Sequence, residues 1–214
     1  MKKAYHIAIE GTIGVGKTSL SKLIADKYNA KLVLEKFEDN PFLSKFYEDR
    51  NNYAFQTQLW FLMERYKQQQ GLEQMDLFSS YMISDYMFIK DRLFASLNLN
   101  DDEMRLYDTV ARALEKDILF PDLVIFLQSS TDKLMSNIAK RGRDYEKNID
   151  WNYINSLNSI YNEFFFRYDR SPLLIINSED LDFVNDSHDL DLIFDFITKP
   201  ERGTRYFNPT KDLS

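Results

Sequence analysis

The sequence predicts an α/β fold in which five strands form a doubly wound parallel sheet with helices on both faces. Two observations predict it. Short apolar runs alternate with longer segments of helical periodicity, and a glycine-rich loop joins the first strand to the first helix. The 214 residues contain no repeat, low-complexity segment or interdomain linker. We therefore expect one domain over residues 1–198, followed by a short polar tail over 199–214.

Each expected strand is a short apolar run. The first ends at the glycine loop, the third ends at Asp85, and the fourth is strongly apolar. Because helical segments separate the runs, the strands are expected to run parallel, with ligands at their carboxyl ends. The five runs cover residues 5–10, 31–34, 81–84, 123–127 and 173–176.

The segments between these runs have the spacing of helices. In the first of them, Leu20, Leu23 and Ile24 lie on one face, as expected for a helix that packs on the sheet. In the fifth, a helical stripe contains Ile154, Leu157, Tyr161, Phe164 and Tyr168. The expected helices cover 17–28, 54–70, 101–119, 131–140, 151–168 and 189–197.

Composition excludes several classes of function. The formal net charge is −7 and no Lys/Arg block occurs, so we expect no nucleic-acid partner. Apolar runs stay well short of the roughly 18 residues of a membrane span, and the N-terminus lacks the features of a signal peptide. The chain has no cysteine, which excludes disulfides and thiolate chemistry. We expect a cytoplasmic protein without a membrane partner.

The loop after the first strand matches the phosphate-loop pattern G-x-x-x-x-G-K-[ST]. Its glycines allow successive N–H groups to face an anion, and the next helix contributes the positive end of its dipole. We expect Lys17 to bind the β- and γ-phosphates of ATP and the Thr18 hydroxyl to hold Mg²⁺. The alternative is a glycine turn without a ligand. The ATP-binding residues are Gly11, Thr12, Ile13, Gly14, Val15, Gly16, Lys17 and Thr18.

Two carboxylates follow strands at the edge of the sheet that faces this loop. Glu35 follows the second strand, where it can accept the proton of an attacking hydroxyl; the alternative is a solvated acid at the strand end. Asp85 follows the third strand, where it can bind Mg²⁺ directly or through water; the alternative is a helix N-cap.

Arg141 and Arg143 flank a glycine after the helix that follows the fourth strand, and Glu146 comes three residues later. Two arginines on a flexible segment can close over the triphosphate as a lid and neutralise charge that develops during phosphoryl transfer. An exposed arginine-rich turn is the alternative interpretation.

Together these residues resemble the deoxynucleoside kinases, and most closely the bacterial deoxyadenosine and deoxyguanosine kinases. The resemblance covers residues 5–195 and implies a P-loop kinase fold with an arginine-bearing lid. It rests on the phosphate loop and on Glu35, Asn40, Pro41, Phe42, Leu43, Phe46, Tyr47, Arg141, Gly142, Arg143 and Glu146.

The resemblance implies how the sugar of a nucleoside is held. Glu35 resembles the base that activates the 5′-hydroxyl. Tyr47 and Glu146 match the positions that hold the 3′-hydroxyl and disfavour a ribose. The family also forms homodimers in which two long helices pack against their copies, and the helix over 54–70 is the candidate here.

The resemblance also implies how the nucleobase is read. Gln58 has the family's spacing from Tyr47 and matches the glutamine that reads the base edge. Arg65 and Asp91 are similar to the arginine and aspartate that lie beside the base, and Phe94 resembles the aromatic residue that stacks on it. An amide, a guanidinium and a carboxylate together can satisfy the donors and acceptors of a purine edge. Because the amide of Gln58 can flip, the sequence leaves adenine against guanine open.

One departure from the family pattern concerns the segment after the third strand. Tyr86 stands where the family usually has an arginine beside the 5′-oxygen. The alignment slips by one residue downstream, so either Lys90 or Asp91 occupies the base-reading position. Our hypothesis is that Lys90 supplies the missing cation, which completes the catalytic set of Lys17, Glu35, Lys90, Arg141 and Arg143.

The sequence therefore predicts an enzyme that uses ATP and Mg²⁺ to phosphorylate the 5′-hydroxyl of a purine deoxyribonucleoside in deoxynucleotide salvage. A nucleoside monophosphate kinase of the thymidylate type is one alternative, but it needs further cations for the acceptor's phosphate, and Tyr86 weakens it. A nucleotide-binding module without phosphoryl transfer is the other.

Overall fold

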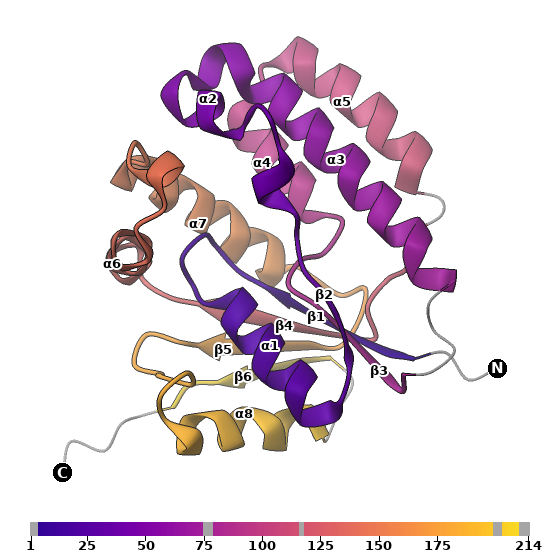
Figure 1. Cartoon of the computed structure of the whole chain (residues 1–214), viewed down its shortest axis with the longest axis vertical. Helices are drawn as coiled ribbons and strands as arrows, with labels where there is room; N and C mark the ends of the chain where they lie inside the picture. Colours follow the sequence, from indigo (N-terminus) through magenta and orange to yellow (C-terminus); the bar gives the residue numbers. More distant parts are fainter. Residues whose placement is uncertain (1–3, 75–78, 116–117, 199–202, 210–214) are drawn as a thin grey trace.

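In the computed structural model, which describes residues 4–74, 79–115, 118–198 and 203–209, a parallel sheet lies between helical layers (Figure 1). The strand order is β2-β3-β1-β4-β5-β6, and every pairing is parallel. The expected doubly wound sheet is thus confirmed, but it has six strands rather than five. The strands are β1 (Tyr5–Glu10), β2 (Lys31–Val33), β3 (Tyr81–Ser84), β4 (Leu123–Gln128), β5 (Leu173–Asn177) and β6 (Thr204–Phe207).

All six expected helices are present, some with shifted ends: the helix expected over 101–119 ends at Leu114 and the long helix begins at Arg50. Two further helices, α2 and α4, and the short 3-10 turns η1 (Phe37–Asp39) and η3 (Asp144–Glu146) were not predicted. The helices are α1 (Lys17–Tyr28), α2 (Leu43–Glu48), α3 (Arg50–Gln74), α4 (Lys90–Asn98), α5 (Asp101–Leu114), α6 (Thr131–Arg141), α7 (Trp151–Phe166) and α8 (Ser187–Thr198).

The strand that was not predicted, β6, lies within the span 199–214 that we expected to be a polar tail. It pairs with β5 from Leu173↔Thr204 to Ile176↔Phe207. Two of its four side chains are exposed and two are half-buried, so the apolar run that identifies the other strands is missing. A polar strand of this kind covers the edge of an otherwise apolar sheet.

Alternate residues of each central strand pack on opposite faces of the sheet. Ile7 and Ile9 of β1 belong to a core cluster with residues of α1 and α8, whereas Ala8 packs with residues of α7. The helices α3, α4 and α5 share a separate cluster around Leu62 and Tyr107, beyond the layer of α7 (Figure 1). None of the described helices is both long and apolar enough to cross a membrane.

This topology brings the carboxyl ends of the parallel strands to one edge. There β1 continues into the phosphate loop, β2 into Glu35 and β3 into Asp85. Because α4 follows closely on β3 and packs on α3, residues of both helices reach the same edge. The fold thus collects residues from distant parts of the chain above the centre of the sheet.

Candidate active site

The loop between β1 and α1 has the conformation that its glycines were expected to permit. Gly11, Gly14 and Gly16 have φ values of 148°, 89° and 102°, where other residues would be strained. Lys17 Nζ donates to the carbonyl oxygens of Gly11 at 2.7 Å and Thr12 at 3.0 Å. The ammonium therefore lies directly against the phosphate loop.

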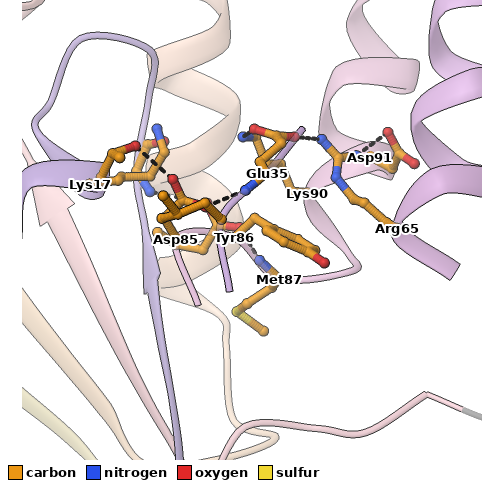
Figure 2. A network of polar contacts seen from close by, with 12 residues as sticks. Lys17, Glu35, Arg65, Asp85, Tyr86, Met87, Lys90 and Asp91 are labelled. Atoms are coloured by element: carbon orange, nitrogen blue, oxygen red, sulfur yellow. Dashed lines mark hydrogen bonds and ion pairs between the residues drawn. The ribbon is translucent and has the colours of Figure 1, made fainter. Parts of the chain in front are cut away.

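The two residues expected to hold Mg²⁺ are in contact. Thr18 Oγ1 donates to Asp85 Oδ2 at 2.6 Å, and the other carboxylate oxygen, Oδ1, accepts from the backbone N–H of Glu35 at 2.8 Å (Figure 2). Helix α4 begins only at Lys90 and its first turn has no side-chain cap, so Asp85 is not its N-cap. A hydroxyl and a carboxylate beside a phosphate loop fit Mg²⁺, which prefers oxygen ligands and takes the rest from phosphate and water.

Glu35 is held between two cations. Its Oε2 accepts from Lys90 Nζ at 2.5 Å, and its Oε1 pairs with Arg65 Nη2 (Figure 2). The side chain is only 13% exposed, which excludes a solvated acid at the strand end. Burial alone would raise the pKa of this carboxyl, but Lys90 and Arg65 outweigh burial and hold the pKa well below its ordinary range. Glu35 is therefore an ionised carboxylate in this site.

Arg65 and Asp91 form a second, deeper pair. Arg65 Nη1 contacts Asp91 Oδ1, and the two side chains are 4% and 1% exposed. Burial raises the pKa of Asp91 to about 7, although the charge of Arg65 opposes this. Asp91 Oδ2 has no hydrogen-bond partner among the described residues. The structure thus separates two neighbours that the sequence left interchangeable, because Lys90 faces Glu35 and Asp91 faces Arg65.

Tyr86 is fully buried and turned toward helix α3. Its hydroxyl donates to Gln68 Oε1 at 2.5 Å, and its ring lies 5.7 Å from the Arg65 guanidinium carbon. The residue that replaces the expected arginine is therefore engaged in packing and in a helix contact. Lys90, four residues later in the chain, is one of the two cations in contact with Glu35.

The residues expected to bind the nucleoside lie on the other side of Glu35. Gln58 is 2% exposed, and its Oε1 has no hydrogen-bond partner within the described part of the chain. Phe94 packs edge-on against Tyr161, at a centroid distance of 6.2 Å. Tyr47 lies on α2 and stacks on Tyr145, with centroids 6.2 Å apart and an interplanar angle of 16°.

The arginine-bearing segment lies against this group. Arg141 donates to Glu146 through Nε at 3.1 Å and through Nη2 at 2.6 Å, while Arg143 Nη1 lies 3.5 Å from the same carboxylate. The Arg143 guanidinium also lies 4.2 Å from the centre of the Phe37 ring. Both arginines are about one-third exposed, and Glu146 is buried. The segment is thus docked on the site rather than free in solvent.

One cavity joins these groups. It encloses about 760 Å³ of space, part of it open to solvent. Of the residues predicted to bind substrate, all except Asp91 line it, and Asp91 lies behind Arg65. The lining residues are Ile13, Gly14, Lys17, Thr18, Glu35, Phe37, Leu43, Phe46, Tyr47, Thr57, Gln58, Phe61, Arg65, Asp85, Lys90, Phe94, Arg141, Arg143, Tyr145 and Glu146.

A second cleft on the far side of the phosphate loop was not predicted. Its walls include Asn137 of α6 and, from the segment after β5, Asp180, Asp182 and Phe183. Asn137 Nδ2 donates to the carbonyl oxygen of Gly14 at 2.9 Å. The signal that could have found it is positional, because the segment after β5 starts at the same edge of the sheet as the phosphate loop.

Comparison with known proteins relates this geometry to one family. A family model described as deoxynucleoside kinase matches residues 7–199. The deoxyguanosine kinase of Bacillus subtilis (strain 168) is 32% identical over 198 residues, which cover 90% of this chain and 96% of that protein. The deoxyadenosine kinase of Dictyostelium discoideum is 35% identical over 178 residues, covering 80% and 71%.

A solved structure agrees with these sequence comparisons. The structure of deoxyadenosine kinase from M. mycoides with bound dATP has a TM-score of 0.80 and 28% sequence identity to this chain. The match covers 91% of this chain and 100% of that one. The chain thus has the P-loop kinase fold over almost its whole length.

Proposed function

Because this chain belongs to the deoxynucleoside kinase family, we propose that it transfers the γ-phosphoryl group of ATP to the 5′-hydroxyl of a purine deoxyribonucleoside, in deoxynucleotide salvage. One observation carries the proposal. A single cavity is lined by residues of the phosphate loop, by the ionised Glu35, and by the buried Gln58 and Arg65, to which we assign base reading. Such an arrangement suits in-line transfer, in which positioning and charge stabilisation supply most of the catalysis.

At the donor end, the amides of the phosphate loop and Lys17 bind the β- and γ-phosphates. Thr18 and Asp85 would hold Mg²⁺, which would supply positive charge against the phosphates. We assign the second cleft, beyond the loop, to the base of ATP, where the carboxylate of Asp180 is available to accept from an exocyclic amine. Removal of divalent cations with a chelator is expected to abolish turnover, and addition of Mg²⁺ is expected to restore it.

At the centre, Glu35 accepts a hydrogen bond from the 5′-hydroxyl and holds it in line with the γ-phosphorus. A carboxylate with a strongly lowered pKa is a weak base, so it first orients this hydroxyl and takes its proton late, as the bond to phosphorus forms and the hydroxyl becomes acidic. Lys90 lies where it can contact the 5′-oxygen and the transferred group, and Arg141 and Arg143 compensate charge from the lid side.

At the acceptor end, Tyr47 and Glu146 bind the 3′-hydroxyl of the sugar. Gln58 and the Arg65–Asp91 pair read the base, and Phe94 stacks on it. The unpartnered oxygen of Gln58 supports this role, since a buried polar atom left without a partner costs about 1–3 kcal/mol.

The experiment that tests the proposal is a panel of acceptors. The protein is incubated with ATP, Mg²⁺ and each deoxyribonucleoside, ribonucleoside and nucleoside monophosphate, and the products are separated. We expect 5′-monophosphates of deoxyadenosine or deoxyguanosine. Diphosphates formed from monophosphates would show a monophosphate kinase instead, and the absence of any acceptor-dependent ADP would show a binding module.

A matched variant tests the role of Glu35. Glu35→Gln keeps the shape of the side chain but replaces the ionised carboxylate with a neutral amide, which is a weaker acceptor and a much weaker base. We expect kcat to fall by about 10²-fold or more while ATP binding, measured by calorimetry, stays unchanged. Unchanged turnover would remove Glu35 from the mechanism.

Two further assignments are also proposals. We propose that the protein is cytoplasmic and forms a homodimer in which α3 packs against its copy, and Met63 of α3 is exposed on the surface. Light scattering during size-exclusion chromatography is expected to give the mass of two chains. The mass of one chain would contradict it.

A further inference from the structure

Glu10 is a buried carboxylate to which the roles above assign nothing. It is the last residue of β1, directly before the phosphate loop, and it is 1% exposed. The described lining of the active-site cavity does not include it. Since burial of a carboxylate is costly unless it is well hydrogen-bonded, its contacts call for an explanation.

The two oxygens of Glu10 accept from backbone amides of different segments. Oε2 accepts from Gly11 N at 3.1 Å, and Oε1 accepts from Met87 N at 2.6 Å. Gly11 opens the phosphate loop, and its carbonyl accepts from Lys17. Met87 lies on the turn between Asp85 and Lys90 and belongs to the network of Figure 2.

The strands themselves cannot make this link. Residues of β1 and β3 pair from Tyr5↔Tyr81 to Ala8↔Ser84, and the pairing stops there. Beyond Ser84 the turn that carries Asp85 has no ladder bonds to β1. The Glu10 side chain therefore connects the two segments at the level where the backbone ladder has ended.

We propose that Glu10 is a positioning residue that fixes the phosphate loop relative to the turn carrying Asp85 and Lys90. Through Gly11 it anchors the donor phosphates, and through Met87 it anchors the groups that face the acceptor. Displacement of one half of the site by about 1 Å can cost up to about 10²-fold in rate. This inference rests on the proposed phosphoryl transfer.

The test compares Glu10→Gln with a control at a carboxylate that contacts the other end of β1. Glutamine keeps the size of the side chain, but its single oxygen can accept from only one of the two backbone N–H groups, of Gly11 or of Met87. Its NH₂ group then faces the other N–H, to which it cannot hydrogen-bond. The control is Asp122→Asn, because Asp122 Oδ2 accepts from the backbone N–H of His6 at 2.8 Å, far from the site. For each variant, kcat and both KM values are measured per folded molecule, together with Tm.

We expect Glu10→Gln to lower kcat by about 10- to 100-fold with both KM values within about threefold of wild type. Asp122→Asn is expected to lower Tm without changing kcat. A kcat of Glu10→Gln within twofold of wild type, or a loss no larger than that of the control, would overturn the proposal. An inactive wild-type protein would instead refute the proposed function.

A second measurement needs no variant and covers the case in which Glu10→Gln fails to fold. Hydrogen exchange of the Met87 amide is followed in the wild-type protein. We expect slow exchange, comparable to that of the amides within β3, because the amide is bonded to a buried carboxylate. Exchange as fast as in exposed turns would show that the Glu10–Met87 bond does not persist, and the proposal would fail.

Discussion

At the scale of single residues, the site is organised around alternating buried charges. Glu35 lies between Lys90 and Arg65, and Arg65 lies between Glu35 and Asp91. Loss of one member leaves a buried charge without its partner, which is far more costly than loss of an exposed pair. The predicted effects of substitution therefore depend on which neighbour each residue faces.

Lys90→Met is expected to lower kcat by about 100-fold, because it removes the cation that we propose takes the place of the arginine absent at position 86. Lys90→Arg keeps the charge and should retain a larger part of the activity. The control is Arg92→Ala on the same helix, because the Arg92 side chain is exposed and pairs with Asp108. Steady-state kinetics with ATP and the preferred nucleoside provide the measurement. If the kcat of Lys90→Met equals that of the control, Lys90 is not needed and Arg141 and Arg143 supply sufficient positive charge.

The ionisation of Asp91 is expected to make the substrate preference depend on pH. The pKa of this buried carboxyl is about 7, so it ionises as the pH rises through neutrality. Asp91 lies behind Arg65 in this structure, and we propose that it reaches the base edge when a nucleoside binds. The ionised carboxylate would then only accept, which favours the exocyclic amine of adenine, while the protonated form could donate to the oxygen of guanine. We expect kcat/KM for deoxyadenosine to rise between pH 6 and 8, and that for deoxyguanosine to fall.

Asp91→Asn is the control for this pH dependence, because an amide does not titrate in this range. In this variant, the ratio of kcat/KM for deoxyadenosine to kcat/KM for deoxyguanosine is expected to stay constant with pH. Parallel profiles for the two nucleosides in the wild-type protein would show that Asp91 does not contact the base edge.

The sequence predicted the chemical types of these residues but not all of their partners. The phosphate loop and Glu35 could be assigned because each directly follows a recognisable apolar strand. The sequence did not resolve which of Lys90 and Asp91 faces the base-reading position, because the start of α4 was unknown. Adjacent residues on a helix point about 100° apart, so an error of one position exchanges their partners.

At the scale of elements, length and capping explain which parts were predictable. Helix α2 has six residues and α4 has nine, too few for a clear helical period. Neither begins with a side-chain cap, as their N-caps are Phe42 and Ile89. In contrast, α5 begins at a full capping box, and its start at Asp101 was predicted correctly.

The lid illustrates how an element is held by aromatic contact. Tyr145 of η3 stacks on Tyr47 of α2 and lies 6.4 Å from the Phe37 ring. Tyr145→Ala is expected to lower kcat/KM for the nucleoside by up to about tenfold, since aromatic pairs contribute about 0.5–1.5 kcal/mol. Tyr145→Phe keeps the ring and should stay near wild type. Equal losses in both variants would assign the effect to the hydroxyl.

At the scale of the whole molecule, the parallel sheet determines which side chains meet. Glu10 ends β1, and Glu35 and Asp85 come after β2 and β3; these three strands are neighbours in the sheet, although 75 positions separate Glu10 from Asp85. This convergence could be predicted from the fold class alone. The sixth strand could not, because β6 alternates exposed and half-buried residues and contains only one inward aromatic side chain.

This inward side chain is Phe207, and substituting it tests how much the last strand contributes to stability. Its ring lies 4.8 Å from Phe196 of α8, whereas the neighbouring Tyr206 is 64% exposed. Phe207→Ala is expected to lower the free energy of unfolding by about 1–2 kcal/mol, below the 3–5 kcal/mol of a fully buried phenylalanine. Tyr206→Ala should change it by no more than about 0.5 kcal/mol. Urea denaturation measures both, and similar effects would mean that β6 only covers an edge. A larger loss from Phe207→Ala would mean that the strand is part of the folded domain, and that the domain extends past residue 198.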